Sequence, residues 1–202
     1  MQQEASSKIG IFGGTFDPIH RGHLDLARHA LKQFRLTKVL FVPALIPPHK
    51  SARRDMTPAP YRYRMVETAV REEPQFEVSD IEFSRPEISY TVDTLRTLKK
   101  FYPSSELYLI LGADSLAEIP KWREADEIVK LARLLVARRP GVTVVLPPYS
   151  VQWIDMSECS LSSSEIRQAI SRGDLLPDEI VPQDVQDYIQ KMQLYRKQTP
   201  CT

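Results

Sequence analysis

The first predicted strand and the first predicted helix of this chain are joined within KIGIFGGTFDPIHRGH, residues 8–23. The apolar run Lys8–Phe12 is typical of a buried strand, and it ends at the paired glycines Gly13 and Gly14. From Gly22 to Arg35, apolar residues recur at spacings of three and four, which predicts a helix. The stretch therefore predicts a strand, a glycine turn and a helix in direct succession.

The same alternation of short apolar runs and helical periodicity continues to the end of the chain. The further strands are predicted at Lys38–Pro43, Phe76–Asp80, Leu107–Leu111, Leu134–Ala137 and Val151–Asp155, and the further helices at Tyr61–Glu72, Val92–Phe101, Ala125–Leu131, Ser163–Arg172 and Gln183–Tyr195. Continuous apolar strands that alternate with helices are typical of a parallel sheet covered on both faces. We therefore expect a Rossmann-like, doubly wound α/β fold with a C-terminal helical segment. It would form one domain over residues 1–202, with flexible tails at 1–7 and 196–202.

Composition excludes several classes of protein. The chain has 202 residues, with 27 Lys and Arg against 26 Asp and Glu, a formal net charge of +1. A nucleic-acid-binding or membrane-surface protein would need a basic excess, so neither partner is expected. No segment approaches the roughly 20 apolar residues of a membrane helix. The two cysteines are too few for a disulfide framework, and the polar N-terminus resembles no secretion signal, so we expect a cytoplasmic protein.

Glycine is scarce and concentrated. The chain holds 7 glycines against 16 prolines, and Gly10, Gly13, Gly14 and Gly22 all fall in the first predicted strand–helix unit. Paired glycines let a backbone approach a bulky ligand, and a helix N-terminus adds partial positive charge, so the segment favours phosphate. Neither known glycine-loop motif is present, because the chain lacks both G-x-G-x-x-G and a Gly-Lys pair.

In place of those motifs, this segment carries two of the four histidines of the chain, His20 and His23. At a spacing of three they share one face of the first helical turn. They also follow a strand end, where open parallel sheets bind their ligands. Each could instead be a capping or partly buried residue. A zinc site is a further alternative, but two histidines are too few ligands and H-E-x-x-H is absent.

These residues resemble a known family. His20-Arg21-Gly22-His23 resembles the (H/T)xGH signature of the nucleotidylyltransferase superfamily, and the longer GGTFDPIHxGH resembles bacterial nicotinate-nucleotide adenylyltransferases. The resemblance extends from about Lys8 to Tyr195. It implies transfer of AMP from ATP to nicotinate mononucleotide, giving nicotinate adenine dinucleotide and pyrophosphate in NAD biosynthesis. In that reaction His20 and His23 would be catalytic and would contact the α- and β-phosphates.

A second phosphate-binding segment is expected near the C-terminus. Read alone, Ser162 and Glu165 form a capping box at the start of a helix. The stretch Leu161–Arg167 is also similar to the family's ISSTxIR motif, from which it departs by Leu161 and Ser164. The two interpretations are compatible, since the guanidinium of arginine suits phosphate. The implied ATP- and phosphate-binding residues are Gly13, Gly14, Thr15, Phe16, Ser162, Ser163, Ser164 and Arg167.

Two further segments resemble the mononucleotide pocket of the family. They are SYTVDTL at Ser89–Leu95 and the Gly112–Asp114 strand end that precedes Trp122. The residues implied are Tyr90, Thr91, Asp114, Trp122 and Arg123, with the indole stacked on the pyridine ring. Without the resemblance, Ser89 or Thr91 would be a helix cap, Asp114 an N-cap and Trp122 a core residue.

The loop that follows the second strand ends in Pro47-Pro48-His49-Lys50, which matches the PPHK loop of the family. His49 and Lys50 are candidate loop contacts to phosphate, and a solvated loop is the alternative. Mg²⁺ is expected to arrive with ATP, so no metal-ligand cluster is predicted in the protein. No strong general base is needed, because the attacking phosphate is already an anion.

Three alternatives stay open. The acceptor could be nicotinamide mononucleotide, since the sequence does not show the contact to the carboxylate or amide. Phosphopantetheine is a weaker alternative, because Tyr90, Thr91 and Trp122 argue against it. From a different class, the chain could be a nucleotide-binding regulator without catalysis, but such a protein should have lost a histidine or the Ser-Ser-Ser segment. The implied partners are ATP and nicotinate mononucleotide, bound by a monomer or a homo-oligomer.

Overall fold

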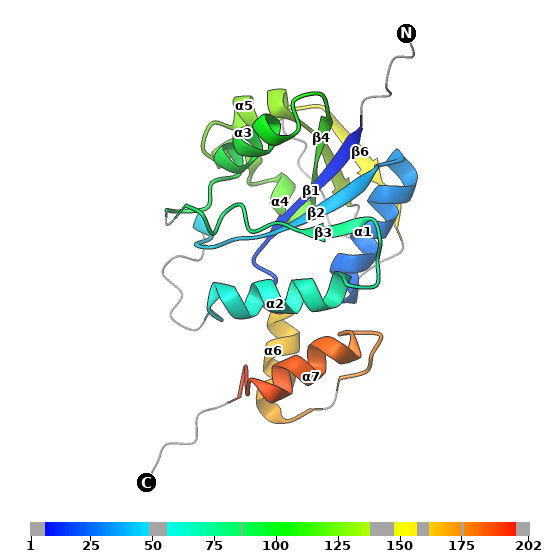
Figure 1. Cartoon of the computed structure of the whole chain (residues 1–202), viewed down its shortest axis with the longest axis vertical. Helices are drawn as coiled ribbons and strands as arrows, with labels where there is room; N and C mark the ends of the chain where they lie inside the picture. The colour runs from blue at the N-terminus through cyan, green and yellow to red at the C-terminus, as the bar shows by residue number, and fades with distance from the viewer. Residues whose placement is uncertain are drawn as a thin grey trace.

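The fold is a parallel sheet with helices on both faces. The computed structural model describes residues 7–48, 56–85, 87–137, 148–156, 162–174 and 176–196. Within those ranges the sheet has six strands in the order β3-β2-β1-β4-β5-β6, and every neighbouring pair is parallel (Figure 1). The strands are β1 (Lys8–Gly14), β2 (Lys38–Pro43), β3 (Phe76–Val78), β4 (Glu106–Leu111), β5 (Ala132–Ala137) and β6 (Val151–Ile154). The strand order reverses between β1 and β4, so the predicted doubly wound α/β fold is confirmed.

Two hydrophobic clusters lie on opposite faces of this sheet, because successive strand residues point to alternate sides. One face is covered by α1 (Arg21–Phe34), α2 (Ala59–Val70), α6 (Ser163–Arg172) and α7 (Gln183–Lys191). The other face is covered by α3 (Thr91–Phe101), α4 (Ala113–Leu116) and α5 (Ala125–Leu131). In β1, Phe12 packs in the first cluster while its neighbour Ile11 packs in the second.

The C-terminal helices α6 and α7 lie beyond α2, on the side away from the sheet (Figure 1). They are joined to the rest of the molecule by apolar packing, since Ile166, Val185 and Ile189 belong to the same cluster as Phe12. Fully burying one such side chain is worth about 1.5–3 kcal/mol. The packing therefore fixes α6 and α7 to the cluster on the α1 and α2 side of the sheet.

The predicted elements are all present, with differences at their ends. The last helix ends at Lys191 and not at Tyr195, because Gln193 and Tyr195 adopt left-handed backbone with φ of 52° and 63°. Helix α4 and a 3₁₀ helix at Ile119–Lys121 were not predicted, since four and three residues are too short to show a helical period. No helix of the described ranges is long and apolar enough to cross a membrane.

Candidate functional site

The site lies at the carboxyl ends of β1 and β4, where the strand order reverses. A Cβ atom built on Gly13, near the end of β1, or on Gly112, directly after β4, would meet no atom within 4 Å. Both strand ends therefore border open space. Since β1 and β4 are neighbours in the sheet, this is the place where a doubly wound fold is expected to bind its ligand.

The two adjacent glycines serve different purposes. A Cβ on Gly14 would lie 2.9 Å from the ring of Phe16, far inside normal contact. Phe16 is buried and holds a left-handed backbone with φ of 49°, and its ring lies close to Gly14. Glycine is therefore required at position 14 by packing, whereas Gly13 faces the open side. The sequence interpretation had given both glycines to the ligand.

The two histidines are in direct contact at the start of α1. His20 is the N-cap of the helix and not part of its first turn, and His23 is the third helical residue. The backbone N–H of His20 donates a hydrogen bond to Nδ1 of His23 at 3.2 Å, and the ring centroids are 3.7 Å apart. An accepting Nδ1 carries no proton, so the neutral ring of His23 holds its proton on Nε2.

The imidazole of His20 is almost fully buried, at 5% exposure. Burial lowers the pKa of His20 from 6.5 to about 4, so the ring is neutral at pH 7. Its Nδ1 has no hydrogen-bond partner among the described residues. A buried polar atom without a partner costs about 1–3 kcal/mol. A ligand that hydrogen-bonds to this nitrogen would remove that cost.

The backbone that follows the glycines is held by residues from α6. Arg167 donates through Nη1 to the carbonyl of Asp17 at 2.7 Å, and the Ser163 hydroxyl donates to the carbonyl of Pro18 at 2.9 Å. Arg167 also donates to the hydroxyl of Ser164 at 3.0 Å. The structure therefore brings the predicted Ser163, Ser164 and Arg167 to the glycine loop, across about 150 residues of sequence.

Ser162 caps α6. Its hydroxyl accepts a hydrogen bond from the backbone N–H of Glu165 at 3.2 Å and bonds to the carboxylate of Glu165 at 2.6 Å. The predicted N-cap by Ser162 is confirmed, and the Glu165 carboxylate accepts from the hydroxyl of Ser162, whereas a full capping box would have it accept from the backbone N–H of Ser162. The cap fixes the first turn of α6, which carries Ser163 and Ser164.

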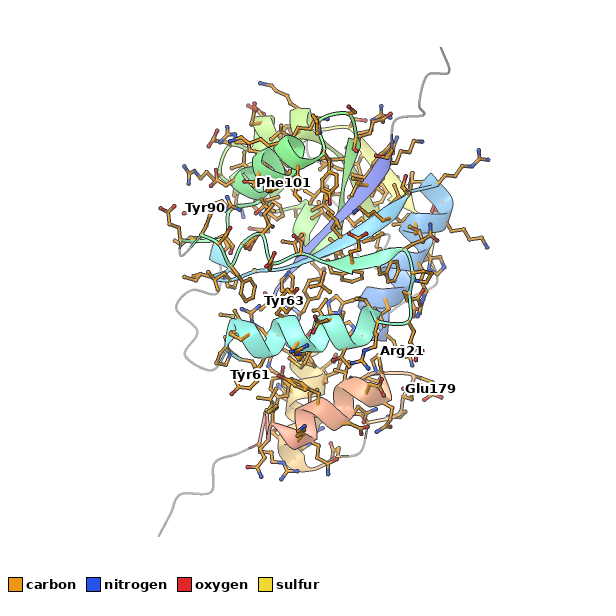
Figure 2. The ribbon with its side chains drawn as sticks, in the orientation of Figure 1. Arg21, Tyr61, Tyr63, Tyr90, Phe101 and Glu179 are labelled. Atoms are coloured by element: carbon orange, nitrogen blue, oxygen red, sulfur yellow. The ribbon has the colours of Figure 1, made fainter. Side chains whose placement is uncertain are left out.

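Helix α1 is also tied to the segment that precedes α7. The backbone N–H of Arg21 donates to the carbonyl of Ile180 at 2.9 Å, and its guanidinium pairs with Asp178 at 2.7 Å. Figure 2 shows Arg21 beside the labelled Glu179 of this segment. The residue between the two histidines is thus an anchor for the C-terminal helices.

The predicted mononucleotide residues lie around the starts of α3 and α4. Tyr90 is the N-cap of α3, and Thr91 is the first residue of that helix. The guanidinium of Arg123 lies 4.8 Å from the ring centroid of Tyr90 and 3.5 Å from a carboxylate oxygen of Asp93. Trp122 packs against the second cluster, and its Nε1 is buried without a partner among the described residues.

The capping alternatives on this side are wrong. The hydroxyl of Ser89 does not cap α3, since it accepts hydrogen bonds from the backbone N–H groups of Leu45 and Ile46 at 3.0 and 3.2 Å. Gly112 is the N-cap of α4, and Asp114 is an exposed residue within its first turn. Ser89 therefore joins the loop after β2 to the start of α3.

Sequence reasoning missed three polar residues of the site, of which two are buried and one, Tyr195, is partly buried. Asp17 is 3% exposed and accepts hydrogen bonds from the hydroxyl of Tyr195 at 2.7 Å and the backbone N–H of Thr57 at 3.4 Å. Burial, strengthened by the nearby Asp17, raises the pKa of Tyr195 well above its ordinary value. The third residue, Arg62, is fully buried. Arg62 shares a helix face with Met65 and Val66, a spacing that could have predicted its burial.

Some predicted residues cannot be placed. His49, Lys50 and Leu161 lie outside the described residues. In the part of the chain that the structure describes, no group of three or more His, Cys, Asp or Glu side chains could hold a metal ion.

Comparison with known proteins shows the family of the chain. The family model described as cytidylyltransferase-like matches residues 11–169. The chain is therefore an enzyme of the nucleotidyltransferase class. It is 42% identical to a "probable nicotinate-nucleotide adenylyltransferase" of Carboxydothermus hydrogenoformans, over 95% of this chain and 100% of that protein. A protein of the same name from Thermus thermophilus is also 42% identical, over 94% of this chain and 100% of its own length. The chain belongs to the nicotinate-nucleotide adenylyltransferase family.

The fold has a solved counterpart. The nicotinic acid mononucleotide adenylyltransferase of Plasmodium falciparum, complexed with APC, superposes with a TM-score of 0.76 at 23% identity. The match covers 94% of this chain and 97% of that one. At this identity the likeness shows that the two proteins share the fold.

Proposed function

We propose that this protein transfers the AMP moiety of ATP to the 5′-phosphate of nicotinate mononucleotide, releasing pyrophosphate and nicotinate adenine dinucleotide. The observation that carries the proposal is the contact between His20 and His23 at the point where the strand order reverses. The adjacent glycine loop is held by a hydrogen bond from Arg167. The family of the chain supports the choice of substrates.

The reaction is an in-line displacement at the α-phosphorus of ATP. An oxygen of the acceptor phosphate forms the new P–O bond, the bond from the α-phosphorus to the bridging oxygen breaks, and pyrophosphate leaves with that electron pair. The acceptor is an anion at neutral pH, so no side chain has to remove a proton. The main difficulty is the repulsion between the two anions as they are brought together, and positioned N–H donors reduce that repulsion.

The side chains at the loop are suited to that task. We propose that His20 and His23 donate ring N–H groups to the α- and β-phosphates, and that Ser163 and Arg167 hold the outer phosphates. Arg167 uses Nη1 and Nη2 for Asp17 and Ser164, and a guanidinium has five N–H donors in all. The loop residues Gly13, Gly14, Thr15 and Phe16 would offer backbone N–H groups to the acceptor phosphate.

Mg²⁺ is proposed to enter with ATP. Apart from the buried Asp17, which accepts from Tyr195, the side chains described at this loop are imidazoles, hydroxyls and a guanidinium, which suit phosphate oxygens. Mg²⁺ prefers oxygen ligands and usually keeps those of the nucleotide and water. When bound, the ion neutralises charge on the departing pyrophosphate. The residues of the chain then bind and orient the nucleotide.

The acceptor would lie on the α3 side of the site. We propose that Trp122 stacks on the pyridine ring, that Tyr90, Thr91 and Asp114 contact the mononucleotide, and that Arg123 stands at the rim. A cation over Tyr90 is well placed to favour a carboxylate over an amide on the pyridine. Nicotinamide mononucleotide remains the second candidate acceptor.

Pyrophosphate release tests the function. Purified protein is supplied with ATP and Mg²⁺, and in separate reactions with nicotinate mononucleotide, nicotinamide mononucleotide or phosphopantetheine. We expect release with nicotinate mononucleotide to be the fastest by at least about tenfold. No release above background with any acceptor would overturn the enzyme proposal, and faster release with nicotinamide mononucleotide would reassign the substrate.

A further inference from the structure

Arg62 is a charged residue in an unusual place. It lies in the first turns of α2 and is 0% exposed. Its guanidinium donates to four backbone carbonyls: Thr57 at 2.8 Å, Thr15 at 2.7 Å, Ala44 at 2.7 Å and Leu45 at 3.2 Å. One side chain therefore joins the glycine loop after β1, the loop after β2 and the segment that precedes α2.

A residue serving stability alone would not need this charge. Burying a charge without a paired carboxylate is costly, and an apolar side chain of similar size is often at least as stabilising. Among the described residues, the guanidinium of Arg62 donates to backbone carbonyls, and the carboxylates of Asp17 and Glu82 act on it only through their charge. The burial is explained if the guanidinium fixes backbone orientation at the site.

The bond to Thr15 determines how one peptide unit faces. In a trans peptide the carbonyl of Thr15 and the N–H of Phe16 point in opposite directions. Because the carbonyl points to the buried guanidinium, the N–H of Phe16 points away from it. A flip of this peptide unit would turn the N–H towards Arg62, where two donors would face each other.

The same peptide unit is held against its own backbone preference. Phe16 has a φ of 49°, a left-handed conformation that costs about 1–2 kcal/mol for a residue other than glycine. A flip of the Thr15–Phe16 peptide would change this φ by about half a turn and relieve the strain. The hydrogen bond from Arg62 opposes that flip.

We propose that Arg62 is a positioning residue that locks the Thr15–Phe16 peptide with its N–H presented to the phosphates of the bound substrates. The inference goes beyond the resemblance to the family, and its kinetic part rests on the proposed function. Arg62 touches no substrate in this scheme and acts through the backbone of Thr15. Its guanidinium fork is essential, because a single ammonium group cannot reach all three segments.

The test compares Arg62→Met, Arg62→Lys and the matched control Arg64→Met. Arg64 lies on the same helix, but it is exposed and pairs with Glu67. Each variant is examined by circular dichroism and thermal unfolding, so that rates refer to folded protein. We expect kcat of Arg62→Met to fall about 100-fold and that of Arg62→Lys about tenfold, with smaller changes in KM, while Arg64→Met stays within about twofold.

A binding measurement separates this inference from the proposed reaction. Inorganic pyrophosphate is titrated into each variant by calorimetry, and we expect at least about tenfold weaker binding to Arg62→Met than to the unaltered protein or to Arg64→Met. A protein inactive with every mononucleotide but showing this loss would refute the proposed function and keep the inference. Folded Arg62→Met with unchanged kcat and pyrophosphate affinity would overturn the inference. If Arg62→Met does not fold, the same result with Arg62→Lys would overturn it.

Discussion

The two sides of the site are built in opposite ways. On the proposed phosphate side, the loop 15–18 is held by hydrogen bonds from distant segments, among them Arg62, Arg167 and the hydroxyl of Tyr195. On the mononucleotide side, Arg123 is half exposed, and its partners Asp93 and Glu124 lie 3.5 and 3.6 Å away. Figure 2 shows Arg21 and Tyr90, one from each side, well separated in this view.

This difference has an energetic meaning. Breaking a buried hydrogen bond leaves a polar group without water and costs about 1–3 kcal/mol, whereas an exposed ion pair contributes about 0–1 kcal/mol. We therefore expect the proposed phosphate side to be fixed before a substrate arrives. We expect the proposed mononucleotide side to adjust to its ligand, which suits the part of a site that distinguishes one mononucleotide from another.

The largest expected effect is on catalysis and comes from His23, on the proposed phosphate side. In His23→Ala the α1 imidazole is lost together with the acceptor for the His20 N–H. We expect kcat to fall by at least about 100-fold, because a phosphate-stabilising donor is lost in the transition state. His29→Ala is the matched control, since His29 lies exposed on the same helix and bonds to the carbonyl of Asp25. Equal turnover in the two variants, measured by pyrophosphate release, would refute the role of His23.

The second effect is a pH dependence of stability that comes from His20. Burial lowers its folded pKa from 6.5 to about 4, so between these values the unfolded chain binds more protons. Stability therefore falls as pH drops from 6.5 towards 4, and by linkage the loss from pH 7 to pH 5 is about 2 kcal/mol. Urea unfolding of the unaltered protein and of His20→Ala at both pH values measures it. We expect the His20→Ala variant to lose about 2 kcal/mol less over this interval, and parallel losses would contradict the assignment.

The order of the elements and one motif of the site are predictable from the sequence. The alternation of apolar runs and helical periods fixes the order of strands and helices, because burial on both faces of a sheet dictates that pattern. Ser162, Ser163 and Arg167 are predictable as candidates because they lie in a recognisable motif, and the structure brings all three to the glycine loop or the helix start beside it.

The missed residues share a physical reason. Arg62 bonds to backbone carbonyls of distant loops, and Tyr195 bonds to the carboxylate of Asp17, so their partners lie at sequence separations that no periodic pattern reports. The spacing of Tyr195 from Val185, Tyr188 and Met192 is helical and predicts a packing helix that includes it. The left-handed residue at position 193 breaks that helix and redirects the phenol towards Asp17.

The third prediction concerns that phenol. Tyr195→Phe removes the 2.7 Å hydrogen bond to the buried carboxylate of Asp17. We expect a loss of about 2 kcal/mol in the free energy of unfolding, because a charged group then lacks one of its donors. Tyr61→Phe is the control, since Tyr61 is exposed on α2. Urea unfolding at pH 7 measures both variants, and equal stability of the two would show that the Asp17 contact contributes nothing.

The smallest effect is expected at Arg123, on the proposed mononucleotide side. Arg123 stacks on Tyr90 and shares Asp93 with Arg96. Its removal in Arg123→Ala should leave stability almost unchanged, because exposed ion pairs contribute little. The KM for nicotinate mononucleotide should rise about three- to tenfold while that for nicotinamide mononucleotide rises less, since only the first carries a carboxylate for the guanidinium.

A matched control is available for this last comparison. Arg133 also lies over a tyrosine ring, that of Tyr108, and pairs with Glu106, but it stands on β5 away from the predicted pocket residues. Arg133→Ala should leave both KM values unchanged. If Arg123→Ala raises both KM values equally, Arg123 shapes the pocket without reading the carboxylate. If it raises neither, the mononucleotide side does not extend to this residue, and discrimination between the two acceptors must come from the groups around Trp122.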